Sequence, residues 1–181
     1  MTGIFGCCVS SMNFTTIPGH SRYEISECGI VFDLKTGKCV ASCISNGYLI
    51  CNIWLESGKR TILGIYVLLA IAFIPNPDNK PTVDHIDCNK SNNSLDNLRW
   101  ATYQEQNWNK VAQGWWYLPK LTKNPYQVQI KNNFGKYIHI GCFSTSEEAQ
   151  IVYEEKCIEW RGIWAPQVYH ENKRLRQLNP N

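Results

Sequence analysis

The distribution of apolar and polar residues divides the chain into short strand-like runs and longer helix-like stretches. Between residues 17 and 60, apolar residues alternate with polar ones over short runs that are separated by glycine turns, which predicts a small β-rich module. Asn46-Gly47 is the strongest turn signal in this region, because this dipeptide favours the two-residue loop of a β-hairpin. Residues 63–74 form the longest apolar run and are too few to span a bilayer, so a buried helix is predicted there.

A second alternating region lies near the C-terminal end of the chain. Two runs, 126–131 and 137–140, place apolar side chains on one face and polar side chains on the other. Thr145 and Glu148 have the spacing of a helix capping box, and apolar residues follow at helical spacing. Three strands packed on one helix are therefore predicted between residues 114 and 164.

Residues 83–109 hold more polar side-chain chemistry than a connecting loop of this length needs. Apolar residues flank an Asp84-His85 pair as they would in a short strand, and a loop rich in Asn, Asp and Ser follows. A second short alternating run comes next, and Thr102 with Glu105 forms another capping box. The segment is predicted to fold as strand, loop, strand and helix.

Composition and charge narrow the class of protein. The chain has 181 residues, 44% hydrophobic content and a net charge of +3, which suits one compact domain or a few small modules. The charge is uneven, because residues 1–109 sum to −1 and residues 110–181 sum to +4. Nine cysteines occur without a C-x-x-C pair, which indicates reduced thiols rather than a zinc clip. The N-terminus has no signal-peptide pattern, so we expect an intracellular, cytoplasmic protein that is neither secreted nor embedded in a membrane.

The order D-H-x-D, then N-N, then N-L-x-W and a capped helix resembles the HNH endonucleases, the ββα-metal nucleases of the phage and intron homing type. The resemblance implies a central ββα-metal core in residues 75–113 of an α+β chain. It also implies that His85 is the general base and that Asn97 orients the histidine loop. Cys88 stands where the family usually has glycine.

The same resemblance implies a metal site. Asp84 matches the metal-binding carboxylate, and a second ligand is expected on the following helix. Counting along the motif leads to Gln106, whereas Asn107 is the residue of the expected type, and Asn107 is our prediction. A hard Mg²⁺ ion (or Mn²⁺) suits such oxygen ligands, and a histidine with a pKa near ~6.5 suits the activation of water.

The segments on either side of this core also resemble known modules. Residues 17–74, after a leader at 1–16, resemble the nuclease-associated modular domain that precedes many HNH cores, where a His often stands at the position of Tyr66. Whether this module contacts DNA or is only scaffold is left open.

Residues 114–164, with G-K-x-I-H-I-G-x-F and T-x-E-E-A-x-x-x-Y, resemble the plant ethylene-response-factor type of DNA-binding domain. The outward side chains of its sheet are then expected to contact DNA. The matching positions are Trp115 or Trp116, Tyr126, Gln127, Gln129, Lys131, Lys136 and His139. The tail at 165–181, with its Lys173-Arg174-Leu175-Arg176 run, either adds phosphate contacts or is solvated.

These features predict a site-preferring, metal-dependent HNH endonuclease of the homing type that cleaves double-stranded DNA and is carried by a mobile element or virus. One alternative is a sequence-specific DNA-binding protein whose HNH core is vestigial. Another is an RNA-directed nuclease or a structural HNH module. One core per chain predicts nicking by a monomer or a double-strand break by a dimer, and the sequence leaves this choice open.

Overall fold

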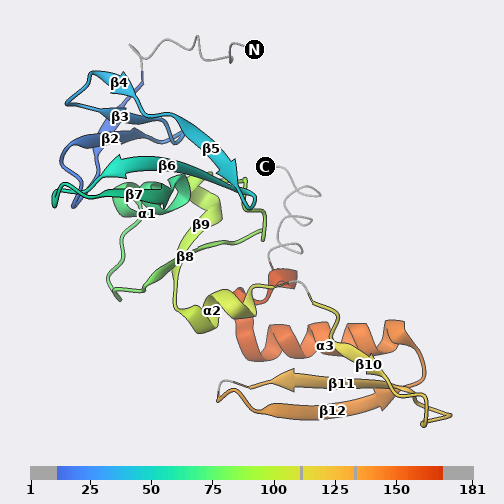
Figure 1. The fold of residues 1–181 in the computed structure, drawn as a ribbon. Helices are drawn as coiled ribbons and strands as arrows, with labels where there is room; N and C mark the ends of the chain where they lie inside the picture. Colours follow the sequence, from blue (N-terminus) through green and yellow to red (C-terminus); the bar gives the residue numbers. More distant parts are fainter. Residues whose placement is uncertain (1–11, 111, 133, 169–181) are drawn as a thin grey trace, which may run out of the picture. The chain divides into compact units, whose positions relative to one another are not determined.

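The computed structural model describes residues 12–110, 112–132 and 134–168, and the chain divides into two compact units (Figure 1). Unit 1 contains the chain up to His85 together with Asn89–Thr102. Unit 2 contains Ile86–Cys88 and the chain from Tyr103 onward. Both units combine small antiparallel sheets with few helices, in agreement with the α+β class expected from the sequence.

The first sheet of unit 1 is an antiparallel meander in the order β1-β2-β3-β4. Its strands are β1 (Phe14–Thr16), β2 (Tyr23–Ser26), β3 (Val31–Asp33) and β4 (Lys38–Cys39). Because β1 pairs with β2, residues Phe14–Thr16 belong to the sheet and not to a leader as the sequence suggested. The rest of that proposed leader, residues 1–11, lies outside the described part of the chain.

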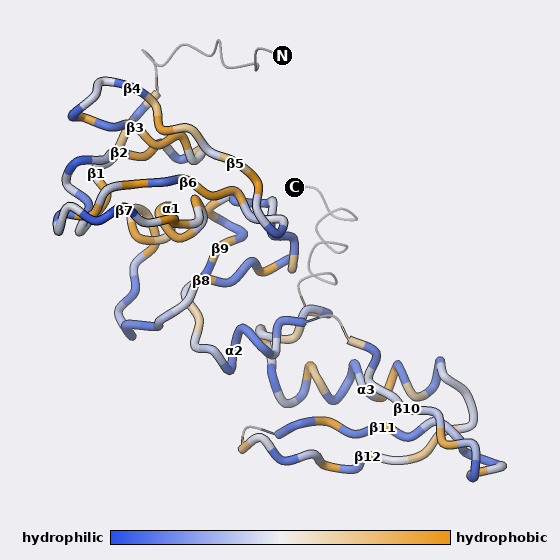
Figure 2. Tube along the Cα trace, viewed as in Figure 1, coloured by the Kyte–Doolittle hydropathy of each residue, from blue (hydrophilic) through white to orange (hydrophobic). Residues whose placement is uncertain are grey.

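The second sheet contains β5 (Ser42–Ser45), β6 (Tyr48–Trp54) and β7 (Arg60–Gly64), and it leads into α1 (Ile65–Phe73). Asn46 and Gly47 join β5 to β6 with φ angles of 49° and 84°. Two successive positive φ angles are what the tight hairpin turn requires, so the predicted hairpin is confirmed. The helix predicted within residues 63–74 is also confirmed, and Figure 2 shows it as predominantly hydrophobic.

The last elements of unit 1 are the antiparallel strands β8 (Thr82–His85) and β9 (Leu98–Ala101), with the short helix η2 (Leu95–Asn97) directly before β9. The indole Nε1 of Trp100 on β9 donates a hydrogen bond to the carbonyl oxygen of Ile74, 2.9 Å away, at the end of α1. This bond ties the strand pair to the helix. One apolar core then joins both sheets, α1 and the strand pair, with buried side chains Ile17, Tyr23, Ile25, Val31, Cys51, Ile53, Ile65, Leu68, Leu69, Ala70, Val83 and Leu98.

Unit 2 contains a three-stranded antiparallel sheet and its covering helix, as the sequence predicted. Its elements are α2 (Tyr103–Trp108), β10 (Trp115–Tyr117), β11 (Tyr126–Lys131), β12 (Tyr137–Phe143), α3 (Ser146–Arg161) and η3 (Gly162–Trp164). The predicted capping box at α3 is confirmed on its N-cap side, because the Thr145 side chain accepts a hydrogen bond from the Glu148 backbone N–H at 3.2 Å.

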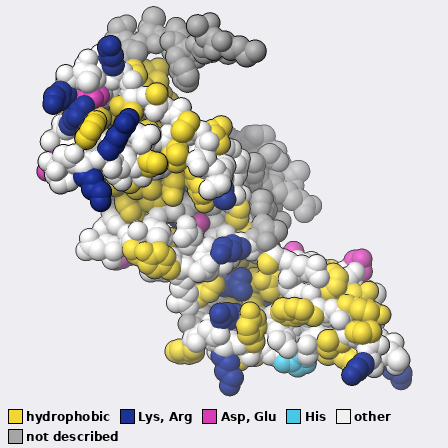
Figure 3. Space-filling model, in the orientation of Figure 1, with side chains coloured by type: hydrophobic (Ala, Val, Ile, Leu, Met, Phe, Trp, Pro, Cys, Tyr) yellow, Lys and Arg dark blue, Asp and Glu magenta, His cyan; other side chains and the backbone are white. Residues whose placement is uncertain are grey.

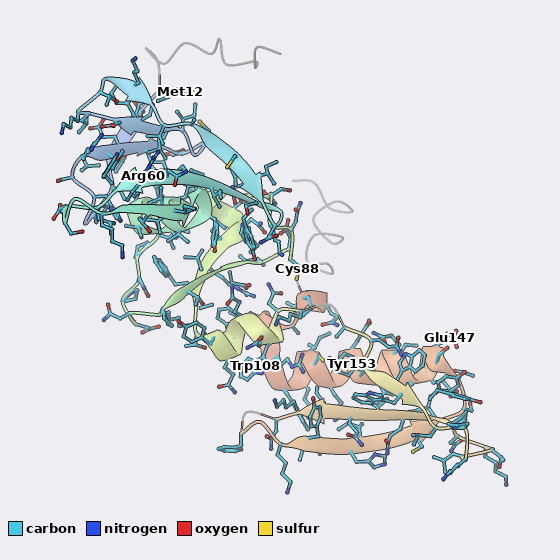
Figure 4. The ribbon with its side chains drawn as sticks, viewed as in Figure 1. Met12, Arg60, Cys88, Trp108, Glu147 and Tyr153 are labelled. Atoms are coloured by element: carbon cyan, nitrogen blue, oxygen red, sulfur yellow. The ribbon has the colours of Figure 1, made fainter. Side chains whose placement is uncertain are left out.

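The core of unit 2 lies between α3 and the sheet and contains Val128, Ile130, Ala149, Tyr153, Cys157 and Ala165. Tyr153, labelled on α3 in Figure 4, lies so close to Gly114 that a Cβ atom there would meet the ring at 1.8 Å. Gly114 therefore lets the chain enter β10 directly over this ring. A bulge between Val128 and Gln129 shifts the register with β12.

The segment predicted as a ββα core is divided between the units. β8 and β9 belong to unit 1, whereas α2 belongs to unit 2. The two strands and the helix thus form at the expected places in the sequence.

Candidate functional site

Asp84 and His85 are the last two residues of β8, and both are almost fully buried, with 5% and 6% of their surfaces exposed. In the pairing with β9, Asp84 lies opposite Arg99 and His85 lies opposite Leu98. Successive side chains of a strand point to opposite faces, so the acid and the imidazole leave β8 in different directions. Each side chain therefore has its own set of partners.

Asp84 forms an ion pair with Arg99 across the strand pair. The Nε and Nη2 atoms of Arg99 both lie 3.0 Å from the Oδ2 atom of Asp84. A buried charge is tolerated where it is paired in this way, and the pair favours the ionised carboxylate. Asp84 is thus held as an anion, which is the form that binds metal ions. The sequence did not single out Arg99, because a strand pattern does not show which residue lies opposite Asp84.

His85 is held by the asparagine-rich loop. Its Nε2 atom lies 3.0 Å from the Oδ1 atom of Asn93. A carboxamide oxygen only accepts hydrogen bonds, so in the neutral ring this contact places the proton on Nε2 and the lone pair on Nδ1. In that tautomer the ring nitrogen that can accept a proton is Nδ1.

Asn97 also forms a hydrogen bond to the asparagine-rich loop. Its side chain is 3% exposed, and its Nδ2 atom donates to the carbonyl oxygen of Asn92 at 2.8 Å. Asn92 directly precedes Asn93, the residue that contacts His85. Asn97 therefore contacts the backbone of the loop, and its orienting role remains a prediction. Asn93 itself was not assigned a role from the sequence, because the N-N pair does not reveal which member reaches the ring.

The two candidate helix ligands differ in their surroundings within unit 2. Asn107 is exposed, its Nδ2 atom donates to the carbonyl oxygen of Tyr103 at 2.8 Å, and its Oδ1 atom accepts from the Lys110 ammonium at 2.6 Å. An amide oxygen bound to an ammonium group must release it before it can bind a cation. Gln106, the position given by counting, is half-buried. The assignment of the helix ligand to Asn107 remains a prediction.

Cys88 takes the place expected for glycine and adopts φ = 61°, the left-handed conformation that glycine favours. Its Sγ atom lies 3.4 Å from the backbone oxygen of Asn109 and 3.5 Å from its Oδ1 atom. The loop thus keeps the turn that glycine would form. A left-handed φ is less favourable for cysteine than for glycine, and the Cys88 side chain makes these two contacts with Asn109 in that conformation.

The sheet of unit 2 presents polar side chains on its open face. Gln127, Gln129 and His139 form a connected array, since Gln127 Nε2 lies 3.2 Å from His139 Nδ1 and Gln129 Nε2 donates to Gln127 Oε1 at 3.2 Å. The Nζ atom of Lys131 lies 5.7 Å from the ring centroid of Tyr137, which is opposite it on β12. Carboxamides, imidazole and ammonium groups therefore share one face.

The structure separates the aromatic candidates on this sheet. Trp115 lies opposite Val128, and both Trp115 and Tyr126 pack against the core of unit 2, with their rings 5.1 Å apart. Trp116 is exposed and lies opposite Gln127. Of the two tryptophans left open by the sequence, Trp116 is thus the one on the open face, together with the exposed Lys131, His139 and, at the hairpin, Lys136. Tyr126 was expected on this face and is instead directed toward α3.

The donor chemistry of the Asp84 region suits a hard cation. Within unit 1, Asp84 supplies a buried carboxylate, and within unit 2, Gln106 and Asn107 carry carboxamide oxygens. Such oxygen ligands match Mg²⁺ or Mn²⁺, which retain several water ligands. Among the described residues there is no group of three or more His, Cys, Asp and Glu side chains that could hold a metal ion.

The buried Asp-His pair at the end of β8 and the asparagine loop bonded to the imidazole fit the resemblance to HNH nucleases seen in the sequence. Comparison with known proteins agrees with this class. Residues 72–108 match the model of a family described as HNH endonuclease. The chain belongs to the HNH endonuclease family, because it is 32% identical over 123 residues to the DNA endonuclease I-HmuI of Bacillus phage SP01, covering 67% of this chain and 68% of that protein.

Other relatives are similar over part of their length. The H-N-H endonuclease F-TflII of Escherichia phage T5 is 38% identical over 96 residues, which cover 51% of this chain and 49% of that protein. An uncharacterized HNH endonuclease of Acanthamoeba polyphaga mimivirus is 33% identical over 114 residues, and these cover 62% of this chain and only 33% of that protein. The chain thus spans between a third and two thirds of the length of these relatives.

One solved structure, of DNA binding and cleavage by the HNH homing endonuclease I-HmuI, aligns with 71% of this chain and 78% of its own at 26% identity and a TM-score of 0.49. Within the described ranges, no helix combines the length and the apolar content needed to cross a membrane.

Proposed function

We propose that this protein is a site-preferring, metal-dependent DNA endonuclease of the homing type that hydrolyses phosphodiester bonds with His85 as its general base. The observation that carries the proposal is the hydrogen bond between His85 Nε2 and Asn93 Oδ1, at 3.0 Å. This bond leaves Nδ1 as the proton acceptor of a neutral imidazole, which is the form needed to deprotonate water near neutral pH.

The proposed reaction divides its tasks among four side chains. His85 accepts the proton of the attacking water, and Asn97 keeps the histidine loop in place through the backbone of Asn92. Asp84 would hold the metal ion, and Asn107 is the carboxamide that we propose as the second protein ligand. When bound, the ion supplies positive charge that stabilises the scissile phosphate and the leaving oxygen. Mg²⁺ is the ion we expect, with Mn²⁺ as a substitute.

Arg99 supports the metal-binding role of Asp84. The guanidinium binds the Oδ2 atom through the contacts described above, so it fixes the direction of the carboxylate and favours its ionised form. A carboxylate that is already ordered loses little side-chain entropy when it binds a cation.

The open face of the sheet in unit 2 is the proposed DNA-binding surface. We assign base and phosphate contacts to Trp116, Gln127, Gln129, Lys131, Lys136 and His139. Gln can bind adenine through two hydrogen bonds, and Lys can neutralise phosphate. Lys and Arg side chains are spread over this part of the molecule among hydrophobic ones (Figure 3). The relative named DNA endonuclease I-HmuI supports DNA as the substrate, and double-stranded DNA is our proposal.

The proposal is tested with a supercoiled plasmid that carries a cleavable site, incubated with the protein and Mg²⁺, with and without a chelator. We expect relaxation of the plasmid only with the metal, and loss of this activity in His85→Ala while binding to DNA in a gel-shift assay is kept. Undiminished cleavage by His85→Ala removes this residue from the mechanism. Binding without cleavage by the wild-type protein favours the vestigial-core alternative.

A thermal-shift titration tests the metal site without relying on activity. Mg²⁺ in excess of its dissociation constant should raise the melting temperature of the wild-type protein, because a ligand that binds only the folded state stabilises it. The same titration of Asp84→Asn should give a smaller rise. Gln106→Ala and Asn107→Ala are the matched pair that identifies the helix ligand, since only the variant that lacks the ligand should lose the shift.

A further inference from the structure

The imidazole of His85 and the rings of two tyrosines form a cluster within unit 1. The ring centroid of Tyr66, on α1, lies 5.0 Å from that of His85, with an interplanar angle of 47°. Tyr48, on β6, lies 5.3 Å from Tyr66 and 6.0 Å from His85. These separations fall within the range in which aromatic rings attract one another. The imidazole of His85 therefore packs against two tyrosines that come from separate elements of the unit.

The position of Tyr66 depends on the absence of a side chain at residue 64. A Cβ atom on Gly64 would lie 2.2 Å from Cε1 and 2.6 Å from Cδ1 of the Tyr66 ring. Gly64 has φ = −71° and ψ = 137°, an extended conformation that any residue adopts. Glycine is thus required here to make room for the Tyr66 ring and not for its backbone freedom.

Tyr48 is in turn held from its far side. The Nζ atom of Lys90 lies 4.7 Å from the Tyr48 ring centroid and donates a hydrogen bond to the carbonyl oxygen of Asn46 at 3.3 Å. Such a cation over an aromatic face is attractive. The lysine comes from the asparagine-rich loop that also contacts His85, so the loop contacts the ring cluster at two positions, Lys90 and Asn93.

We infer that Tyr66 is a positioning residue for His85, acting through its ring. The hydrogen bond from Nε2 to Asn93 Oδ1 fixes one edge of the imidazole, and the Tyr66 ring against its side restricts rotation about the Cβ–Cγ bond. Together these contacts hold Nδ1 in one direction. The inference rests on the proposed function, in which Nδ1 accepts a proton from water and must point at it.

Two substitutions separate the ring of Tyr66 from its hydroxyl group. Tyr66→Phe keeps the ring, so we expect kcat for plasmid nicking within about threefold of the wild type. Tyr66→Leu fills part of the volume but removes the ring, so we expect kcat to fall by about 10–100-fold with KM nearly unchanged, because a small misplacement of a catalytic group costs that much. A Tyr66→Leu protein that is folded and retains wild-type kcat overturns the inference.

Gly64→Ala provides a second route to the same displacement. Its new Cβ atom occupies the place of the Tyr66 ring, and we expect the same loss of kcat as in Tyr66→Leu. In the Tyr66→Leu background the ring is already gone, so Gly64→Ala should add no further loss. Independent, additive losses in the double variant contradict a shared mechanism.

A spectroscopic measurement tests the geometry whether or not the protein cleaves DNA. The imidazole proton resonances of His85 are identified as those missing from the spectrum of His85→Ala. They should carry a ring-current shift that is kept in Tyr66→Phe and lost in Tyr66→Leu. Resonances that do not move in Tyr66→Leu overturn the inference. If they move as expected in a protein that shows no nuclease activity, the positioning of the ring is upheld and the proposed function fails.

Discussion

Replacing Arg99 with methionine tests whether the buried carboxylate of Asp84 depends on its ion pair. The Asp84 side chain is 6% exposed and that of Arg99 is 15% exposed, so solvent screens the pair only weakly. Methionine keeps most of the length of the arginine chain and removes both nitrogens that lie 3.0 Å from Oδ2. Because loss of one partner leaves a charge in a poorly solvated place, the free energy of unfolding should fall by about 3–5 kcal/mol.

The assay is urea unfolding at neutral pH without divalent cations, followed by circular dichroism. Asp84→Asn removes the carboxylate charge and keeps an acceptor for Arg99, and the double variant removes both charges. Because the cost of Arg99→Met arises from the charge of Asp84, the double variant should be more stable than the sum of the single losses predicts, by about 1–3 kcal/mol. An Arg99→Met protein within about 1 kcal/mol of the wild type, or additive losses in the double variant, would refute the reasoning.

Three further predictions concern other parts of the molecule. The hydrogen bonds from Arg22 hold the pKa of Asp33 well below its usual range. The Asp33 carboxylate therefore stabilises the fold fully above the unfolded pKa of about 3.9, and this contribution is lost as the pH falls from there through the lower pKa of the folded state. Thermal unfolding of Asp33→Asn should therefore lose less stability on acidification than the wild type, and equal slopes would contradict this. Burial raises the pKa of Cys51 to about 11, so iodoacetamide at mildly alkaline pH should label the exposed Cys43 before Cys51, as read by peptide mass spectrometry. Thr145→Ala should cost about 1 kcal/mol in urea unfolding through loss of the α3 cap, and an unchanged midpoint would contradict the cap.

Local signals in the sequence were sufficient for much of the fold. Asn46-Gly47 specified a hairpin because few dipeptides tolerate two positive φ angles, and Thr145 with Glu148 specified the start of α3 because side chain and backbone satisfy each other there. The apolar run at residues 63–74 predicted α1 as a buried helix, since a helix that is apolar on all sides is stable only when it is buried.

The partners of the candidate site were harder to predict. His85 contacts Asn93, Tyr66 and Tyr48, and these come from a loop, a helix and a strand that are brought together only by the tertiary fold. A strand pattern also does not specify register, so nothing in the sequence distinguished Trp115 from Trp116. Once the pairing with β11 is known, Trp115 faces the core and Trp116 faces outward.

The bulge in the sheet of unit 2 determines where a change in the length of β12 keeps the outer face of the sheet in register. Ile140 is the residue that the pairing skips, because Val128 lies opposite Gly141 and Gln129 lies opposite His139. The residues of β12 that pair with Lys131, Gln129 and Gln127 therefore change from odd numbers, Tyr137 and His139, to an even number, Cys142. Deleting Ile140 would remove the bulge and leave these pairings in place, but it would also remove a side chain that packs against the core of unit 2. Inserting one residue elsewhere in β12 would instead turn every outer side chain beyond it inward.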